Sequence, residues 1–378
     1  MKRIICFFVC CILWLSATVA GAENETAIDG VDAKACVLIE QSTGKVLREM
    51  NADEKLPIAS VTKIMTMLLI MEEINSGNLK YDDMVSVSEN AMSYGGSTMF
   101  LEQGELLPVK DMLKGIAVAS ANDGCVAMAE HISGSESAFV DKMNKRAKEL
   151  GMENTNFMNT NGLDEENHYS SARDVALMSR QLLEYPEITE YTSIWTDQLR
   201  DGKFELANTN KLIRFYSGAN GLKTGSTSQA LCCLSASAKR EDMQLIAVVL
   251  GSPTSAKRFS SAKALLDYGF ASYRINRLTQ RDEEISECDV INGTRNTVKA
   301  VAKEEKCLLE EKNNTQEIEK RVYMDNDITA PVKKGDVIGR LDFVTGEKVL
   351  DKVELVAAED VTKKNIFMII RDITESFL

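Results

Sequence analysis

The sequence predicts a mixed α/β domain over residues 30–275, a small β-rich domain over residues 276–358 and an amphipathic helix over residues 359–378. The chain has 378 residues, more than one domain usually holds, and 44% of them are hydrophobic, which suffices for two cores. After Tyr273, charged runs alternate with short stretches typical of β-strands. These two observations place the domain boundary near residue 275.

The first 22 residues have the composition of an export signal. Lys2 and Arg3 make a positively charged start, residues 4–15 are apolar, and residues 20–22 offer a small-residue cleavage site. The alternative is a membrane anchor, but this apolar stretch is short for a span, which needs about 20 residues. We therefore expect residues 1–22 to be a signal peptide.

A β-hairpin and a buried helix should open the first domain. Residues 35–40 and 46–49 are strand-like and flank a Ser-Thr-Gly-Lys turn. Residues 61–71 are an apolar run of good helix formers that stops at an Asn-Ser-Gly sequence. A helix that is hydrophobic all round is a buried one, so Ser60 should lie at the N-terminus of a central core helix.

The remainder of the first domain should be rich in helix and then close with strands. The helical stretches are residues 109–116, 127–130 and 138–143, and the strand-like runs are residues 230–237 and 245–250. We expect Ser260 to start the last helix, through Leu265 and Leu266, as its N-terminal cap. In the second domain the β-like stretches are residues 297–301, 321–323 and 353–356.

The C-terminal segment has an apolar stripe at helical spacing, formed by Ile366, Ile369, Ile370, Ile373 and Phe377. Such a helix can lie in a membrane interface, with Lys363, Lys364 and Arg371 near lipid head groups, but it is too short to span the bilayer. The alternative is a terminal helix docked on the β-rich domain, which the acidic residues Asp372 and Glu375 leave open.

Three short motifs follow one another along the first domain: Ser-x-x-Lys at residues 60–63, Ser-x-Asn at 120–122 and Lys-Thr-Gly at 223–225. Each motif is weak alone, because residues 42–45 and 260–263 also fit Ser-x-x-Lys. Only a helix brings a serine and the lysine three positions later onto one face, which favours Ser60 over the serine of the hairpin turn. The alternatives are a plain helix cap at Ser60 and an ordinary edge strand at 223–225. We favour an active site over both, because all three motifs occur in the expected order.

These motifs and several longer stretches resemble the serine-type D-alanyl-D-alanine carboxypeptidases, low-molecular-mass penicillin-binding proteins that trim peptidoglycan. The similar stretches are residues 58–65, 119–123, 161–164, 168–174, 208–212 and 221–225. The resemblance implies a penicillin-binding/β-lactamase-like transpeptidase fold in which the first and last strands of the domain share one sheet. Two departures concern substrate preference and β-lactam affinity: Leu231 replaces an expected glycine, and Ser226 an aromatic residue or histidine.

The resemblance also implies catalytic roles. Ser60 attacks the carbonyl between the two terminal D-alanines of a stem pentapeptide, and water then releases the trimmed peptide from the acyl-enzyme. Lys63 is the proposed base, and burial together with the cation of Lys223 should lower its pKa. Ser120 relays the proton to the leaving amine, while Asn122 holds Lys63 and the substrate amide.

The substrate-binding residues implied by the resemblance lie on and below the Lys-Thr-Gly strand. Lys223 and Gly225 line the cleft, Thr224 and Arg258 hold the terminal carboxylate, and the backbone N–H groups of Ser60 and Ser226 form the oxyanion hole. A β-lactam antibiotic imitates the D-Ala-D-Ala unit and should trap the serine covalently. No cofactor and no metal ion is expected.

Two related activities and one non-enzymatic function remain alternatives. A class A-like β-lactamase needs a dedicated glutamate and lacks the second domain and the terminal helix. A D,D-endopeptidase acting on peptidoglycan cross-links would use the same bond and stays open. A wall-binding protein without activity is disfavoured, because all the motif residues are intact. With the export signal and the terminal helix, we expect a peripheral enzyme on the outer face of the cytoplasmic membrane.

Charge and metal-ligand content exclude other classes of function. The net charge is −13, and loss of Lys2 and Arg3 with the signal makes it −15, which disfavours nucleic-acid binding. The two histidines, His131 and His168, are far apart and lack a Cys-x-x-Cys partner, so a metal site is not expected. Six cysteines remain after the signal, and those in apolar surroundings, Cys36, Cys125, Cys232 and Cys233, are expected to be buried thiols.

Overall fold

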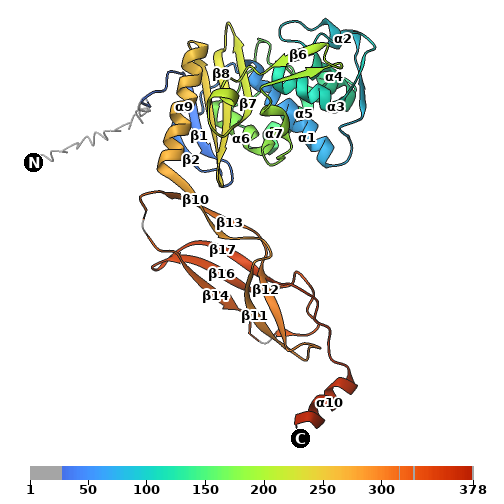
Figure 1. Ribbon diagram of the computed structural model, residues 1–378, viewed down its shortest axis with the longest axis vertical. Coiled ribbons are helices and arrows are strands. Elements are labelled where there is room, and N and C mark those ends of the chain that lie inside the picture. The colour runs from blue at the N-terminus through green and yellow to red at the C-terminus, as the bar shows by residue number, and fades with distance from the viewer. Residues whose placement is uncertain (1–27, 315, 327, 377–378) are drawn as a thin grey trace, which may run out of the picture.

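A five-stranded antiparallel sheet organises the first domain, in the order β2-β1-β9-β8-β7 (Figure 1). Its strands are β1 (Ala35–Glu40), β2 (Val46–Met50), β7 (Ala219–Thr227), β8 (Leu231–Arg240) and β9 (Met243–Ser252). The computed structural model describes residues 28–314, 316–326 and 328–376, so the expected signal peptide lies outside the described residues. The first strand pairs with the last, with Val37 opposite Val248, as the family resemblance implied.

The two faces of this sheet are buried against different helices (Figure 1). Leu38 and Leu245 face α9 (Ser255–Ser272), whereas Ile39 and Ile246 belong to the core that contains α1 (Lys63–Asn75) and α6 (Ala172–Leu182). Side chains alternate between faces along a strand, so a strand buried on both faces must be apolar throughout. All six residues of β1 are buried, and the first five, Ala35 to Ile39, are apolar; the sixth is Glu40.

A helical region fills the space beyond α1 (Figure 1). Its elements are α2 (Glu89–Ser93), α3 (Val109–Lys114), a π-helical turn (Gly115–Ala119), α4 (Asn122–Ser133), α5 (Glu136–Glu149) and α7 (Ile188–Thr192). The short α8 (Leu212–Phe215) instead lies against β7, with Leu212 in the core that contains α9. Two two-stranded sheets accompany it, β3 (Met84–Ser86) with β4 (Leu106–Pro108), and β5 (Thr196–Leu199) with β6 (Phe204–Ala207). The first nine residues of α1 are all buried, so the predicted central helix is confirmed.

The prediction for the start of the last helix is wrong. α9 begins at Ser255, and Thr254 caps it by accepting a hydrogen bond from Lys257 N at 3.2 Å. Ser260 lies inside the helix and donates to the Lys257 carbonyl at 3.0 Å. Because β9 ends at Ser252, the chain must turn into the helix before it reaches Ser260.

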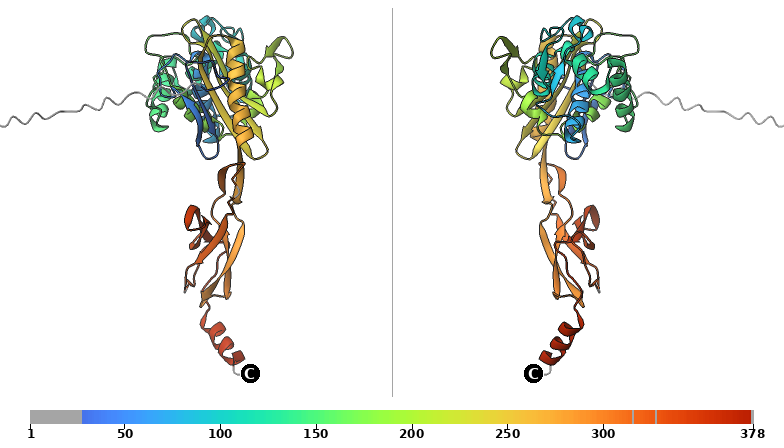
Figure 2. Two further views of the ribbon diagram at one scale, coloured as in Figure 1. Left: turned by 90° about the vertical axis from the view of Figure 1, so that its left-hand side faces the viewer. Right: turned by 90° about the vertical axis from the view of Figure 1, so that its right-hand side faces the viewer.

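The second domain is a β-structure that continues directly from α9 (Figure 2). One sheet has the order β14-β16-β17-β12-β11-β15, and β10 pairs with β13 in a second, two-stranded sheet. The strands are β10 (Tyr273–Thr279), β11 (Glu284–Ile291), β12 (Thr297–Ala302), β13 (Lys306–Glu311), β14 (Glu319–Met324), β15 (Ile328–Thr329), β16 (Val337–Thr345) and β17 (Lys348–Ala357). Its separate core centres on Phe343, Leu341 and Leu355, which are fully buried.

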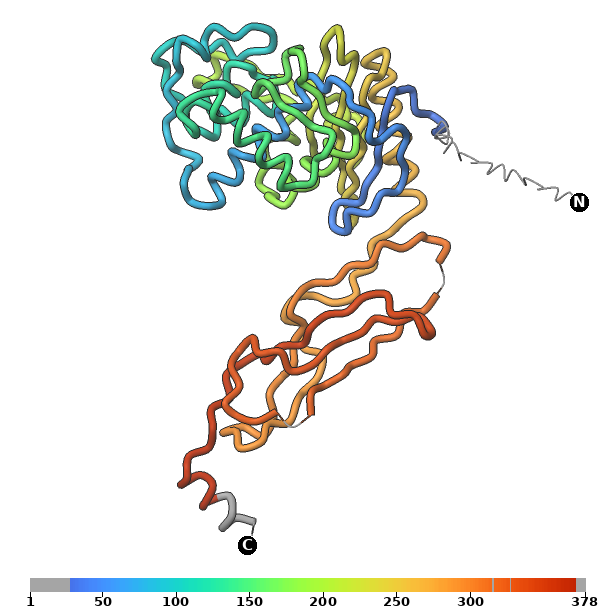
Figure 3. The backbone as a smooth tube through the Cα atoms, turned by 180° about the vertical axis from the view of Figure 1, so that it is seen from behind, coloured from blue at the N-terminus to red at the C-terminus, as the bar shows by residue number. Residues whose placement is uncertain are grey.

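The C-terminal helix α10 (Ile366–Ser376) projects from the far end of the second domain, away from the first domain (Figures 1 and 3). It begins seven residues later than predicted, because Val361 pairs with Val332 and Lys363 with Gly293 in extended bridges. Within the described range no helix is both long and apolar enough to cross a membrane. Part of the predicted stripe, Phe377, lies outside the described residues.

Candidate active site

Ser60 and Lys63 meet on one face of the turn that leads into α1. Ser60 lies in a 3-10 turn (Ala59–Thr62) and Lys63 is the first residue of the α-helix. Lys63 Nζ lies 2.9 Å from Ser60 Oγ. The i,i+3 spacing therefore produces the predicted contact, whereas Ser42, in the hairpin turn, binds the Glu40 carboxylate at 2.9 Å instead.

The turn that carries Ser60 is held by two close backbone approaches. Ala59 has φ +48°, in the left-handed region. A Cβ atom on Gly162 would lie 1.9 Å from the Ala59 carbonyl oxygen, and one on Gly225 would lie 2.7 Å from the Ile58 carbonyl oxygen. Both positions exclude any side chain, so the glycine of the Lys-Thr-Gly strand lets β7 approach the Ser60 turn.

Lys63 is completely buried and makes three polar contacts. Besides Ser60 Oγ, its Nζ donates to Asn122 Oδ1 at 2.7 Å and to the Asn161 carbonyl at 2.6 Å. Burial lowers the pKa of Lys63 to about 8, although nearby Asp123 acts in the opposite direction. About one molecule in ten is then neutral at Lys63 at pH 7.

Lys223 is also buried, on β7, and its pKa lies well below the usual lysine value. Burial is the main cause, and the cation of Lys63 adds to it. Burial, one of the two predicted causes, is the cause that lowers the pKa of Lys63. Lys223 Nζ donates to the Thr224 carbonyl at 3.0 Å.

The Ser-x-Asn motif lies where the π-helical turn meets α4. Ser120 has φ +65° and is 4% exposed, and Asn122 begins the helix. Asn122 Nδ2 donates to the Gly95 carbonyl at 2.7 Å, which orients its Oδ1 toward Lys63. Asp123, a residue that sequence reasoning missed, accepts backbone N–H groups of residues 99 and 101 and so fixes the loop above the motif.

The expected carboxylate-binding residues come together below β7. Arg258, 6% exposed, reaches up from α9 and donates from Nη1 to the Gly225 carbonyl at 3.1 Å. The Thr224 hydroxyl shares a hydrogen bond of 2.6 Å with Thr209, whose role was not predicted. Ser226 is exposed at the end of this strand, with Cys232 opposite it on β8. Leu231 has φ +58°, a conformation that favours the glycine expected there.

The loop of residues 157–168 packs against the turn that carries Ser60 and against Lys63. His168 anchors it: Nδ1 accepts from Met158 N at 3.1 Å, so Nε2 carries the proton and donates to Thr62 Oγ1 at 2.8 Å. Burial lowers the pKa of His168 to about 4, which keeps the imidazole neutral. At the other side, Thr227 Oγ1 donates to Asp164 at 2.6 Å. His168 is therefore a structural residue.

The remaining expectations concern thiols, metals and other cavities. Cys36, Cys125 and Cys233 are buried, as predicted. The prediction for Cys232 is wrong: it is partly exposed, because it lies opposite the exposed Ser226 near the ends of β7 and β8. The described residues contain no group of three potential metal ligands.

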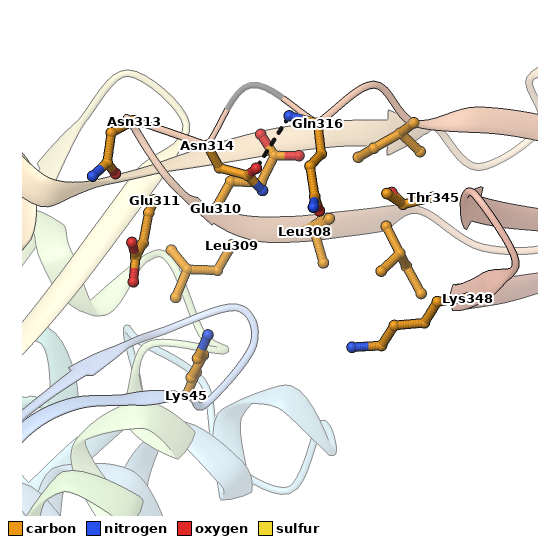
Figure 4. Close-up of a pocket in the computed structure, with 12 residues that line it drawn as sticks. Lys45, Leu308, Leu309, Glu310, Glu311, Asn313, Asn314, Gln316, Thr345 and Lys348 are labelled. Atoms are coloured by element: carbon orange, nitrogen blue, oxygen red, sulfur yellow. Dashed lines mark hydrogen bonds between the residues drawn. The ribbon is translucent and has the colours of Figure 1, made fainter.

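A cavity of about 460 Å³ lies at the domain junction, between Lys45 of the β1–β2 turn and β13 (Figure 4). Its buried carboxylate, Glu310, accepts hydrogen bonds from Arg274 and Asn276, so this carboxylate does not indicate a binding site in the cavity.

The sequence matches the family described as D-alanyl-D-alanine carboxypeptidase over residues 21–254. The chain belongs to this family of serine hydrolases. Residues 273–363 of the carboxypeptidase match a second family, described as the penicillin-binding protein 5 C-terminal domain.

Relatives of the carboxypeptidase cover nearly the whole chain. It is 47% identical to D-alanyl-D-alanine carboxypeptidase DacF of Bacillus subtilis, over 88% of this chain and 86% of the relative. It is 35% identical to D-alanyl-D-alanine carboxypeptidase DacC of Escherichia coli, over 93% of this chain and 89% of the relative.

Solved structures show the same architecture. Penicillin-binding protein 5 of Haemophilus influenzae superposes with a TM-score of 0.73 at 34% identity, covering 89% of this chain and all of the other. A penicillin-binding protein of Listeria monocytogenes with ampicillin bound matches 65% of this chain and all of its own, at 31% identity and a TM-score of 0.59.

Proposed function

We propose that this carboxypeptidase removes the terminal D-alanine of peptidoglycan stem pentapeptides through an acyl-enzyme on Ser60. The observation that carries the proposal is the set of contacts around Lys63. Asn122 Oδ1 and the Asn161 carbonyl only accept hydrogen bonds, so they hold two N–H groups of the lysine. When Lys63 loses a proton, its lone pair must point along the third contact, toward Ser60 Oγ at 2.9 Å.

This geometry makes neutral Lys63 the base for acylation. The Ser60 hydroxyl proton passes to Nζ while Oγ bonds to the carbonyl carbon of the penultimate D-alanine. The bond to the terminal D-alanine then breaks, and Ser120 passes the proton on to the leaving amine. The backbone N–H groups of Ser60 and Ser226 stabilise the oxyanion, a contribution that is typically worth about 2.7–4 kcal/mol per donor.

The position of β7 supports a peptide substrate. β7 is an edge strand of the sheet, so an extended stem peptide can pair with it as an added strand. Its terminal carboxylate would then reach the Thr224 hydroxyl and the Arg258 guanidinium, which restricts the enzyme to peptides with a free C-terminus. Lys223 supplies a further positive group beside the cleft. The similar Listeria protein was solved with ampicillin bound, which supports β-lactam acylation here.

Intact-mass spectrometry with benzylpenicillin tests the nucleophile. We expect one covalent adduct, mapped to Ser60 by peptide analysis, and D-alanine release from a D-Ala-D-Ala pentapeptide. Ser60→Ala should lose both adduct and activity with an unchanged melting temperature, while the matched variant Ser42→Ala keeps both. An adduct on Ser42 or Ser260 would contradict the assignment.

We also propose export to the outer face of the cytoplasmic membrane, with α10 lying in the interface. Ile366 is 63% exposed and Phe367 78% exposed, and two lysines precede them. Such apolar side chains gain free energy when a membrane covers them, and nearby cations favour anionic lipid. The helix lies beyond the second domain, at the opposite end of the molecule from the first domain, so the second domain would hold the site away from the bilayer (Figure 1).

Removal of α10 tests this placement. A chain ending at Asn365 should stay folded, hydrolyse a soluble peptide at an unchanged rate and no longer sediment with anionic liposomes. The double variant Ile366→Ser with Phe367→Ser should behave likewise, whereas Ile291→Ser with Val322→Ser, exposed apolar positions of the second domain, should still sediment. A truncated chain that melts many degrees lower and still binds liposomes would identify α10 as a docked structural helix.

A further inference from the structure

Asn161 carries a buried hydrogen-bond donor that is not used within the protein. Its side chain is fully buried, and Nδ2 has no partner among the described residues. The other polar groups of Asn161 are engaged: Oδ1 accepts from Leu163 N at 3.1 Å, and the carbonyl accepts from Lys63. Because Leu163 N–H needs that acceptor, the amide cannot be reversed. Buried donors in folded proteins almost always have acceptors, so a small molecule entering the site is the expected partner.

The residue that carries this donor lies in the immediate surroundings of the nucleophile. The Asn161 carbonyl is 2.6 Å from Lys63 Nζ, which is 2.9 Å from Ser60 Oγ. The next residue, Gly162, packs so closely on the Ser60 turn that a Cβ atom there would lie 2.9 Å from Ser60 N. The backbone of Asn161 and Gly162 thus belongs to the part of the 157–168 loop that packs against Lys63 and the Ser60 turn.

We propose that Asn161 Nδ2 positions the water that hydrolyses the acyl-enzyme. This inference rests on the proposed acyl-enzyme at Ser60. In the acyl-enzyme, Asn122 and the Asn161 carbonyl still hold the two N–H groups of neutral Lys63, so its lone pair keeps its direction. A water molecule between Nζ and Nδ2 donates one proton toward the lysine and accepts the Asn161 N–H.

The step balances without any further reactant. The water oxygen bonds to the acyl carbon while one water proton moves to Lys63 Nζ. The bond between the acyl carbon and Ser60 Oγ then breaks, and Lys63 returns the proton to Oγ. The trimmed peptide leaves as a carboxylic acid and the enzyme is restored. Asn161 thus acts as a water-positioning residue and exchanges no proton.

Two variants remove the donor in different ways. Asn161→Leu is neutral and similar in size but removes the acceptor for Leu163 N together with the donor, whereas Asn161→Asp keeps that acceptor and replaces the donor with a charged oxygen. Intact-mass spectrometry follows two rates with benzylpenicillin: formation of the adduct and its decay after excess penicillin is removed. In both variants we expect the adduct half-life to lengthen at least about tenfold. Acylation should change by less than about threefold in Asn161→Leu, whereas the carboxylate of Asn161→Asp should raise the pKa of Lys63 and slow acylation as well. With pentapeptide, the acyl-enzyme should accumulate and kcat should fall.

A matched control separates the donor from the loop that carries it. Asn144 makes two hydrogen bonds to the backbone of Phe157, both at 2.8 Å, at the start of the same loop. Asn144→Ala should loosen the loop and lower the melting temperature without a selective change in adduct decay. If it lengthens the half-life as much as the Asn161 variants do, the effect belongs to the loop and the inference is wrong.

The remaining outcomes also decide the question. Wild-type decay rates in both Asn161 variants would overturn the inference, and so would an equal slowing of acylation and decay in Asn161→Leu, because that pattern means that Asn161 orients Lys63. A wild-type enzyme that forms no adduct would instead contradict the acyl-enzyme itself.

Discussion

The two domains differ in whether their buried charged side chains form ion pairs. In the second domain the buried carboxylates each have a cation at the surface: Glu310 pairs with Arg274 at 3.2 Å and Asp342 with Arg340 at 2.6 Å. In the first domain Lys63 and Lys223 are fully buried, and neither forms an ion pair with a described residue. An unpaired buried cation is destabilising, so the difference shows where the protein gives up stability for reactivity.

The largest effect is expected when Lys63 is replaced by a residue that stays protonated. Lys63→Arg keeps the positive charge but cannot release a proton near neutral pH, so acylation by benzylpenicillin should fall by about 10²–10⁴. Rates of adduct formation measure the effect. The matched variant Lys303→Arg, in an exposed pair with Glu354 of the second domain, should acylate normally. Near wild-type acylation of the Lys63 variant would mean that another group is the base.

A core substitution in the second domain should lower stability and leave acylation unchanged. Phe343 is fully buried there, and Phe343→Ala should destabilise that domain by about 3–5 kcal/mol. The site lies in the other domain, so benzylpenicillin acylation at 25 °C should be unchanged. Calorimetry with parallel activity measurements checks both. A loss of acylation below the melting transition would show that the two domains are energetically coupled.

The mildest test changes only pH. The base must be neutral, and the pKa of Lys63 is about 8, so the acylation rate should rise about tenfold per pH unit below 8 and level off above it. His168, with a pKa of about 4, should leave no inflection near pH 6. A stopped-flow profile from pH 6 to 10 measures this. A flat profile would show that Lys63 is already neutral throughout that range.

The contact between Ser60 and Lys63 could be predicted from the sequence because it depends on residues close together in the chain. Ser60 and Lys63 are three positions apart at a helix start, and the family resemblance carried by the ordered motifs implied that Ser120 and Lys223 belong to the same site. The elements of the first sheet and the β-rich nature of the second domain were also predicted, since apolar runs and charged turns report burial directly.

What the sequence did not show depends on contacts between distant residues. The start of α9 is set by the end of β9, so Ser260 only resembled a cap. The closeness of Gly162 to the Ser60 turn depends on the position of the 157–168 loop, which is anchored by its own His168 to Thr62 and by Asn144 of α5 to Phe157. An unpartnered amide such as that of Asn161 becomes visible only once every neighbour has been placed.

The pairing of β1 with β9 also constrains when this protein can fold. Val37 meets Val248 across the centre of the sheet, so the first strand to be made has to wait for the last strand of the domain. Closing so long a loop is entropically costly, and folds dominated by such contacts form slowly. During synthesis the apolar residues of β1 stay without their partner until β9 emerges. The complete sheet therefore cannot form until the chain has been made as far as Ser252, the end of β9.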